Sequence, residues 1–318
     1  MTNAPRVLDH LPETNFIGMI DLTRSPPPGS PPAGVCAARK AVRNDLMNDA
    51  ALVESLRKAV SSGAMLVPSV GNVGDGLIQL GTFDLLASLD ISLPTMVGLD
   101  RELLGTADAL VVGGGGGWVE GLYDTWVWAL TPFLEKGGQL VILPSSISGY
   151  QEFFARFGAQ ITLFARERET VEQMEDIAEM RGRVHLAHDL AFGIKPDRFA
   201  LHSLHPGDGV GFMMRTDKES RQAEVRFGNL DLALARNGVQ WTSPETCLAA
   251  VDRVAHLMTL YSTIVSDRLH MSALAALTGR RVEMVGNSYH KNRGVYAHTL
   301  SRFPNVRFFE TWEPISDA

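Results

Sequence analysis

The 318-residue sequence has little cysteine, with only Cys36 and Cys247, and no Cys-x-x-Cys pair. This excludes a disulfide framework and a zinc ribbon, and it is typical of a reducing compartment. Positive charge is not in excess, because the formal net charge is −7, which argues against binding nucleic acid by phosphate neutralisation. No apolar run reaches about 18 residues, and the N-terminus lacks a signal-peptide pattern, so we expect a cytoplasmic protein without a membrane span.

Several nucleotide-binding and hydrolase motifs are also missing. There is no Gly-x-x-x-x-Gly-Lys-[Ser/Thr], which excludes a P-loop, and no Gly-x-Ser-x-Gly nucleophile elbow. The glycine run 113–117 is no dinucleotide fingerprint, since Trp118 stands where the third glycine is required. No Asp-x-Asp occurs, which argues against a sugar transferase that holds its metal by that motif.

Short apolar runs alternate with segments long enough for helices from residue 46 onwards. Such alternation predicts βαβ units, and therefore an α/β fold with two Rossmann-like domains whose parallel sheets face a cleft. The expected strands are 65–67, 109–112, 140–143, 160–164, 184–186, 209–214, 263–265 and 281–285. The expected helices include 77–88, 170–180, 244–260 and 271–277.

Composition divides the chain into three parts. Residues 24–33 contain five prolines, so we interpret residues 1–45 as an extended, Pro-rich N-terminal arm, with a poorly ordered tail as an equal alternative. Residues 46–195 then form an N-terminal Rossmann-like domain and residues 196–318 a C-terminal one. The boundary lies where Lys195-Pro196 and His205-Pro206 interrupt the alternating pattern.

Unusual residues follow several expected strands, where ligands bind in parallel α/β sheets. Two glycine clusters, 71–76 and 113–117, allow a close approach of the backbone to a ligand. A histidine, His270, lies at another strand end. The basic residues at such ends are Arg166, Arg215, Arg268 and Lys291. In an acidic chain this clustering indicates a small polyanionic ligand held in a cleft.

These motifs, in this order over about residues 60 to 300, resemble the polysaccharide pyruvyl transferase family, and most closely its exopolysaccharide members. The motifs that carry the resemblance are Gly71-Asn-x-Gly-Asp75, the glycine run 113–117, Arg215-Thr-Asp-Lys-Glu219, Ser266-Asp-Arg-Leu-His270 and Asn287-Ser-Tyr-x-Lys291. The resemblance implies a two-domain fold similar to the GT-B glycosyltransferases. It also implies transfer of pyruvate from phosphoenolpyruvate to two sugar hydroxyls, in a polysaccharide or its lipid-linked precursor, which forms a cyclic ketal and releases phosphate.

By the same resemblance, His270, Arg268 and Arg166 are the expected catalytic residues, with His270 as general acid and base. Donor binding is assigned to Arg268, Arg166, Lys291, Arg215, Ser266, Asn287 and Tyr289. Acceptor binding is assigned to Gly71, Asn72, Gly74, Asp75, Gly114, Gly115 and Gly116. The family's Arg-Asp segment is Arg166-Glu167 here, which leaves an alignment on Arg168 open.

No step of this reaction needs a metal or a redox cofactor, so we expect neither. If the acceptor is lipid-linked, we expect peripheral contact with the inner face of the cytoplasmic membrane. A GT-B glycosyltransferase that uses a nucleotide sugar is the main alternative, because it shares the fold but gives no reason for the arginine set. A non-catalytic saccharide-binding protein is a third interpretation, against which the intact Arg268-Leu-His270 motif counts.

Overall fold

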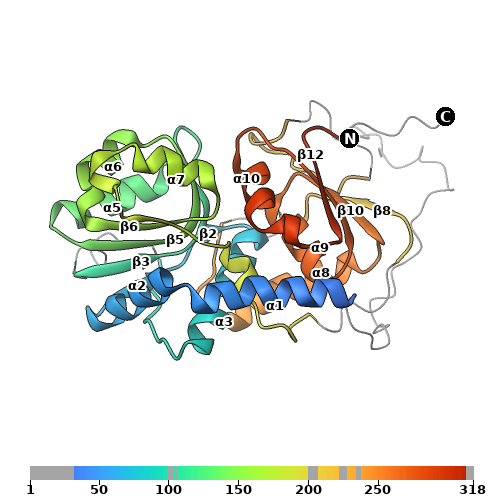
Figure 1. Cartoon of the computed structure of the whole chain (residues 1–318), viewed down its shortest axis with the longest axis horizontal. Helices are drawn as coiled ribbons and strands as arrows, with labels where there is room; N and C mark the ends of the chain where they lie inside the picture. The colour runs from blue at the N-terminus through green and yellow to red at the C-terminus, as the bar shows by residue number, and fades with distance from the viewer. Residues whose placement is uncertain are drawn as a thin grey trace, which may run out of the picture.

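The computed structural model of the chain describes residues 32–98, 104, 106–199, 207–221, 228–233 and 238–312. Figure 1 shows two lobes side by side, each with a sheet and helices packed against it. The strands of the larger sheet all end by Leu186, and those of the smaller sheet begin at Val210. The predicted α/β fold with parallel sheets is therefore confirmed, whereas the boundary at residue 195 stays a prediction.

The first lobe contains a six-stranded sheet of parallel neighbours in the order β1-β3-β5-β6-β7, with β4 paired to β5. Every residue of β3 is buried, because helices cover both faces of the sheet (Figure 1). The strands are β1 (Met65–Val67), β3 (Ala109–Val112), β4 (Gly115–Val119), β5 (Gln139–Ser148), β6 (Ile161–Ala165) and β7 (Val184–Leu186). The helices of this lobe are α2 (Ala50–Ser61), α5 (Thr125–Glu135), α6 (Gln151–Phe157) and α7 (Arg168–Glu175), with the 3-10 turns η1 (Gly158–Gln160), η2 (Ala178–Met180) and η3 (Leu190–Gly193).

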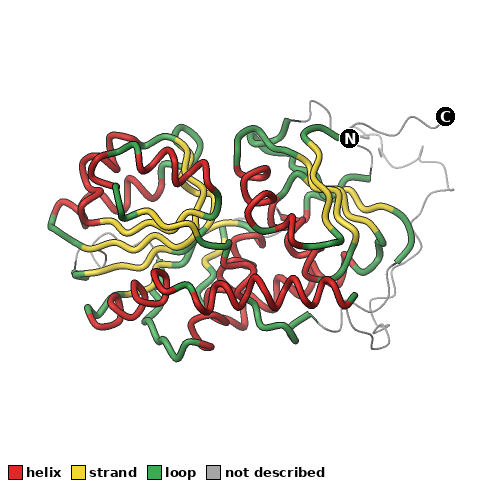
Figure 2. Tube along the Cα trace, in the orientation of Figure 1, coloured by secondary structure: helices red, strands yellow, loops and turns green. Residues whose placement is uncertain are grey.

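The second lobe contains a four-stranded parallel sheet in the order β12-β11-β10-β8. Its strands are β8 (Val210–Phe212), β10 (Thr263–Ser266), β11 (Arg281–Val285) and β12 (Val306–Phe309). Its helices are α8 (Pro244–Met258), α9 (Leu269–Leu277) and α10 (Lys291–His298), followed by the 3-10 turn η6 (Leu300–Arg302). Figure 2 shows strand, loop and helix alternating through both lobes, which is the order that the apolar pattern predicts.

The two lobes share packed elements. Helix α3 (Val73–Ser88) of the first lobe packs against α8 of the second, and one apolar core contains Leu80 from α3 and Val251 from α8. The short strands β2 (Val70–Gly71) and β9 (Val239–Gln240) pair antiparallel and connect the lobes a second time. One continuous hydrophobic core therefore connects the two lobes that form the site.

One prediction needs correction at the N-terminus. Residues 1–31 of the expected extended arm lie outside the described residues, but its last part is helical, because α1 spans Ala33–Asn48. The buried face of α1 includes Val35, Val42 and Leu46 at helical spacing, together with Arg39, whose guanidinium interrupts the apolar stripe in the sequence. Among the described residues, no helix combines the length and the apolar character needed to cross a membrane.

Candidate active site

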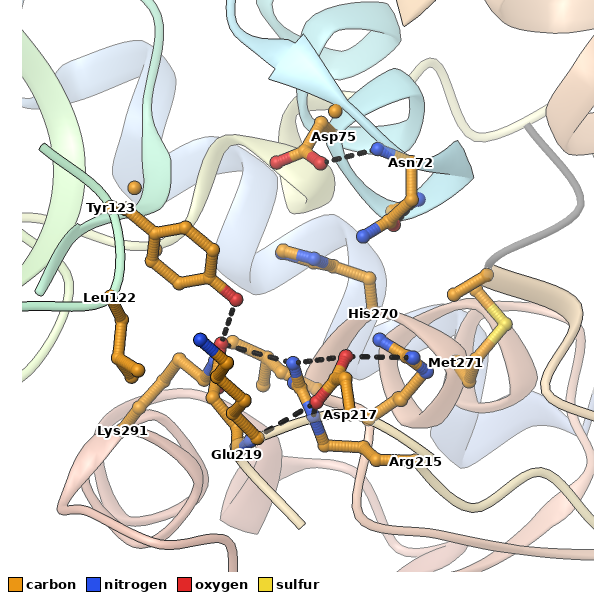
Figure 3. Close-up of a pocket in the computed structure, with 18 of the residues that line it drawn as sticks. Asn72, Asp75, Leu122, Tyr123, Arg215, Asp217, Glu219, His270, Met271 and Lys291 are labelled. Carbon is orange, nitrogen blue, oxygen red and sulfur yellow. Dashed lines mark hydrogen bonds and ion pairs between the residues drawn. The ribbon is translucent and has the colours of Figure 1, made fainter. Parts of the chain in front are cut away.

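A cavity of about 540 Å³ lies between the two lobes. The carboxyl ends of parallel strands open onto it, as the switch-point rule predicts. Arg166 comes just after β6, Arg268 after β10 and Lys291 after the end of β11. The first lobe adds the N-terminus of α3 and part of the glycine run that begins β4. Figure 3 shows His270 between Asp75 on one side and the charged cluster around Glu219 on the other.

The cavity brings together most of the residues predicted from the sequence. Those that line it are Gly71, Asn72, Gly74, Asp75, Gly116, Arg166, Arg215, Arg268, His270 and Lys291. Five predicted residues do not line it: Gly114, Gly115, Ser266, Asn287 and Tyr289. Ser266 instead holds the backbone, since its hydroxyl donates to Met213 O at 2.6 Å and accepts from the amide of Arg268. Asn287 and Tyr289 line a smaller neighbouring cavity of about 290 Å³.

Arg166 is fully buried at the base of the cavity. Its Nε donates to Ser146 Oγ at 2.8 Å, and its Nη1 donates to Asp189 Oδ2 at 2.6 Å. Burial alone would lower the pKa of Arg166, but the charges of Asp189 and Glu167 outweigh burial and raise it. Its Nη2 is buried and has no hydrogen-bond partner among the described residues. Arg166 is therefore a permanent cation whose Nη2, with its two N–H donors, is left for a ligand.

Arg168, the alternative position in the alignment, is exposed at the start of α7 and does not line the cavity. The geometry therefore favours Arg166 for the arginine of the family's motif.

Asp189 holds His270 as well as Arg166. His270 Nε2 lies 3.2 Å from Asp189 Oδ2 and 3.4 Å from Arg166 Nη1. Burial alone would raise the pKa of Asp189, but the charges of His270 and Arg166 hold it well below its ordinary value. Asp189 therefore stays ionised and orients the imidazole, an arrangement suited to general acid–base chemistry.

The cations of the second lobe are paired with carboxylates. Arg215 contacts Asp217 at 2.8 Å and Glu219 at 2.9 Å, and Lys291 Nζ donates to Glu219 at 2.5 Å. Arg268 contacts Asp217 at 3.0 Å and also binds Asp231. The cluster is therefore a network of cations and carboxylates, of which only the cations were predicted from the sequence.

Burial acts in opposite directions on this network. Burial lowers the pKa of Lys291 to about 8, although the neighbouring Glu219 favours the charged form. Burial would raise the pKa of Glu219, but Lys291 and Arg215 outweigh it and lower the pKa to about 2. The carboxylate is thus ionised at neutral pH, and the ammonium loses its proton just above neutral pH.

The first glycine cluster begins α3 with a capping box. The Asn72 side chain accepts from the amide of Gly74 at 2.8 Å, and Asp75 accepts from the amide of Asn72 at 2.9 Å. A Cβ at Gly71 would lie 2.0 Å from Asp75 Oδ2, and one at Gly74 would lie 2.9 Å from His270 Nδ1. These glycines therefore let Asp75 fold back and His270 approach α3.

Asp75 also faces the charged residues of the site. Burial raises its pKa, and the charges of His270, Arg166 and Lys291 only partly offset this effect. Asn72 and Asp75, two of the residues predicted to bind the acceptor, therefore have a local capping role in addition to facing the cavity.

The second glycine cluster approaches the base of the cavity. A Cβ at Gly116 would lie 3.3 Å from Arg166 Nη2 and 3.5 Å from both Lys291 Nζ and Tyr289 Oη. The Tyr289 hydroxyl, like Arg166 Nη2, is buried without a hydrogen-bond partner in the described part of the chain. Glycine at 116 thus leaves space where these polar atoms converge.

Sequence reasoning missed the acidic half of the site. Asp189 shortly follows the end of β7, as the strand-end rule requires, yet it was not among the site residues predicted from the sequence. Asp217 and Glu219 belong to a motif from which only Arg215 was selected. Asp231 is close to Arg268 only in the folded chain, and no pattern in the sequence signals it.

Comparisons with known proteins agree with this geometry. A family model described as polysaccharide pyruvyl transferase matches residues 39–289. A crystal structure of a functionally uncharacterised protein from Klebsiella pneumoniae subsp. pneumoniae is 26% identical, with a TM-score of 0.70, and the match covers 82% of this chain and 96% of that one. No curated protein matches the chain significantly. The chain belongs to the polysaccharide pyruvyl transferase family, as its motifs predicted, and is a transferase.

Proposed function

We propose that the protein transfers pyruvate from phosphoenolpyruvate to two hydroxyls of a sugar and forms a cyclic ketal. The sugar belongs to a polysaccharide or to its lipid-linked precursor. The observation that carries the proposal is the free Nη2 of Arg166 at the base of the cavity, within a cluster of further cations. Phosphoenolpyruvate carries a carboxylate and a phosphate on three carbons, and arginine binds either group through paired N–H bonds.

The reaction can be written with protons and bonds in balance. A proton adds to the methylene carbon of the donor, and C2 becomes cation-like. One sugar hydroxyl attacks C2, the bond from C2 to the phosphate oxygen breaks, and the second hydroxyl attacks C2 to close the ring. The two hydroxyl protons balance the proton added to the methylene carbon and the one carried away by hydrogen phosphate.

His270 is positioned to handle the protons of this sequence. Its imidazole lines the cavity, and Asp189 fixes its orientation from behind. An imidazolium can protonate the methylene carbon, and the imidazole that remains can accept a hydroxyl proton. Arg166 and Arg268 then stabilise the carboxylate and the departing phosphate, with Lys291 beside them.

The two walls of the cavity suit two different substrates. The second lobe supplies Arg215, Arg268 and Lys291, so we place the anionic donor between this wall and Arg166 at the base of the cavity. The first lobe supplies Asn72 and Asp75 at the opposite wall, where polar side chains can bind sugar hydroxyls. For a lipid-linked acceptor, this reaction would take place in the cytoplasm at the inner face of the membrane.

Calorimetric titration with phosphoenolpyruvate, and separately with uridine and guanosine diphosphates, tests the proposal. Phosphoenolpyruvate should bind the wild type, and Arg166→Lys should weaken it about tenfold or more, because lysine keeps the charge but loses the planar fork. Arg156→Lys, at an exposed position, is the control and should bind like the wild type. Tighter binding of a nucleoside diphosphate than of phosphoenolpyruvate would replace the proposal with a nucleotide-sugar transferase.

A further inference from the structure

Tyr123 lies at the first-lobe wall of the cavity, in the loop between β4 and α5. It is the only phenylalanine, tyrosine or tryptophan among the described residues that line the cavity, and 39% of it is exposed. Leu122 lines the same wall. Figure 3 shows the Tyr123 hydroxyl directed at Glu219.

Tyr123 is held in place by hydrogen bonds at its hydroxyl and at its backbone. Its hydroxyl donates to Glu219 Oε1 at 2.9 Å, a hydrogen bond that joins the two lobes. Its carbonyl accepts from the Tyr150 hydroxyl at 2.9 Å, and its amide donates to Val119 O at 2.9 Å. A ring fixed in this way loses little freedom when a ligand packs against it.

The loop that carries Tyr123 is itself anchored by an unusual residue. Tyr150 has a left-handed backbone with φ 59°, which is uncommon outside glycine and is often retained for function. Its amide donates to Glu120 at 3.0 Å, and its single hydroxyl hydrogen is shared between Tyr123 O and Asp124 Oδ1, the latter at 2.5 Å. Residues on both sides of Tyr123 are therefore fixed by one residue, through the backbone amide and the hydroxyl of Tyr150.

From these contacts we infer that Tyr123 is a specificity-determining residue for the acceptor, whose pyranose ring packs its C–H face on the aromatic ring. A three-carbon donor fills only part of a cavity of about 540 Å³, and the donor's anionic groups favour the cationic wall. The free space beside Tyr123 is aromatic on one side and polar at Asn72 and Asp75 on the other. Such a mixture suits a neutral sugar. The inference rests on the proposed function for the position of the donor.

Binding of methyl β-D-glucopyranoside, methyl β-D-galactopyranoside and methyl α-D-mannopyranoside, followed by saturation-transfer NMR and titration, tests the inference. At least one should bind the wild type through its ring C–H protons. Tyr123→Phe keeps the ring and should stay within about threefold, whereas Tyr123→Ala should weaken binding about tenfold or more. Phe309→Ala removes a similarly exposed aromatic ring (38% exposed, on β12) and should change nothing.

Equal binding of every glycoside by wild type and Tyr123→Ala would overturn the inference, and so would binding of none of them by the wild type. Phosphoenolpyruvate titration of the same variants separates this outcome from failure of the donor proposal. Glu219 keeps Arg215 and Lys291 when Tyr123 is replaced, so Tyr123→Ala should bind phosphoenolpyruvate within about threefold of the wild type. If the donor fails to bind while a glycoside binds through Tyr123, the proposed donor is wrong and the sugar site stands.

Discussion

At the level of single residues, Asp189 holds together two of the proposed catalytic groups. One of its oxygens contacts both Arg166 and His270, and all three side chains come from different segments of the chain. A buried carboxylate between a guanidinium and an imidazole compensates the positive charge of the guanidinium and orients the imidazole ring. The reactivity of His270 therefore depends on a residue that does not itself line the cavity.

Replacing Asp189 with Asn leaves the buried Arg166 charge without its partner. We expect a loss of about 3 kcal/mol in the free energy of unfolding, measured by urea denaturation, and a fall in kcat of about a hundredfold. Glu135→Gln, in the exposed pair with Arg156, is the matched control and should change stability by less than about 0.5 kcal/mol. A stable, fully active Asp189→Asn protein would contradict this role.

The pKa of Lys291, lowered by burial to about 8, sets an expected pH limit. The protonated form attracts the anionic donor, so donor affinity is present below this pKa and lost as the pH rises through it. Phosphoenolpyruvate titrations across pH should therefore show weaker binding above about pH 8 in the wild type. Lys291→Arg stays charged and should remove the decline. The same alkaline decline in both proteins would rule out Lys291 as its cause.

The basic residues of the site could be predicted because each follows a buried strand, and strand ends meet at one edge of a sheet. Their carboxylate partners could not. Asp231 and Arg268 pair across 37 positions of the chain, and nothing in the local pattern reports such a contact. Ser266 was predicted to bind the donor, but its hydroxyl donates to the backbone carbonyl of Met213. A polar residue at a strand end can therefore bind the backbone instead of a ligand.

At the level of elements, the N-terminus of α3 connects folding to the site. Its capping box uses Asn72 and Asp75, both of which line the cavity. Asn72→Ala should therefore destabilise the protein by about 1 kcal/mol in chemical denaturation, and Asn72→Asp by much less, because aspartate is an equally good cap. Equal losses in the two variants would show that the amide group, and not the cap, is what matters.

Helix α1 contacts both lobes and holds them together. Its buried Arg39 donates to Leu277 O at the end of α9 and to Pro196 O near the lobe boundary. Arg39→Met removes both bonds but keeps much of the stem, and we expect it to cost about 2 kcal/mol of unfolding free energy. The exposed Lys40→Met is the control, and a loss no larger than that of the control would contradict the role of Arg39.

The strands could be predicted more accurately than α1, for a physical reason. Strand β3 was predicted at its observed bounds, since a buried parallel strand is a short apolar run between polar segments. Helix α1 was missed because the interpretation of the Pro-rich run 24–33 was extended to residue 45, and because Arg39 interrupts the apolar stripe, where its guanidinium binds carbonyl groups of other elements. A buried helix face that contains an arginine can be recognised only when the groups that bind the arginine in the folded chain are known.

At the level of the whole molecule, the lobes are not independent. One core cluster joins α3 to α8, and β2 pairs with β9 across the boundary. We therefore expect a single thermal transition in scanning calorimetry, with equal calorimetric and van't Hoff enthalpies. Two resolved transitions would show that the lobes fold separately.

The cavity between these coupled lobes is where the account makes its central claim, that the anionic donor binds against the base formed by Arg166. The most direct measurement is a crystal structure of the protein soaked with phosphoenolpyruvate. The account predicts a donor carboxylate or phosphate oxygen within hydrogen-bond distance of Arg166 Nη2, with His270 facing the methylene carbon. Donor density outside the cavity, or Nη2 still without a partner in the complex, would contradict it.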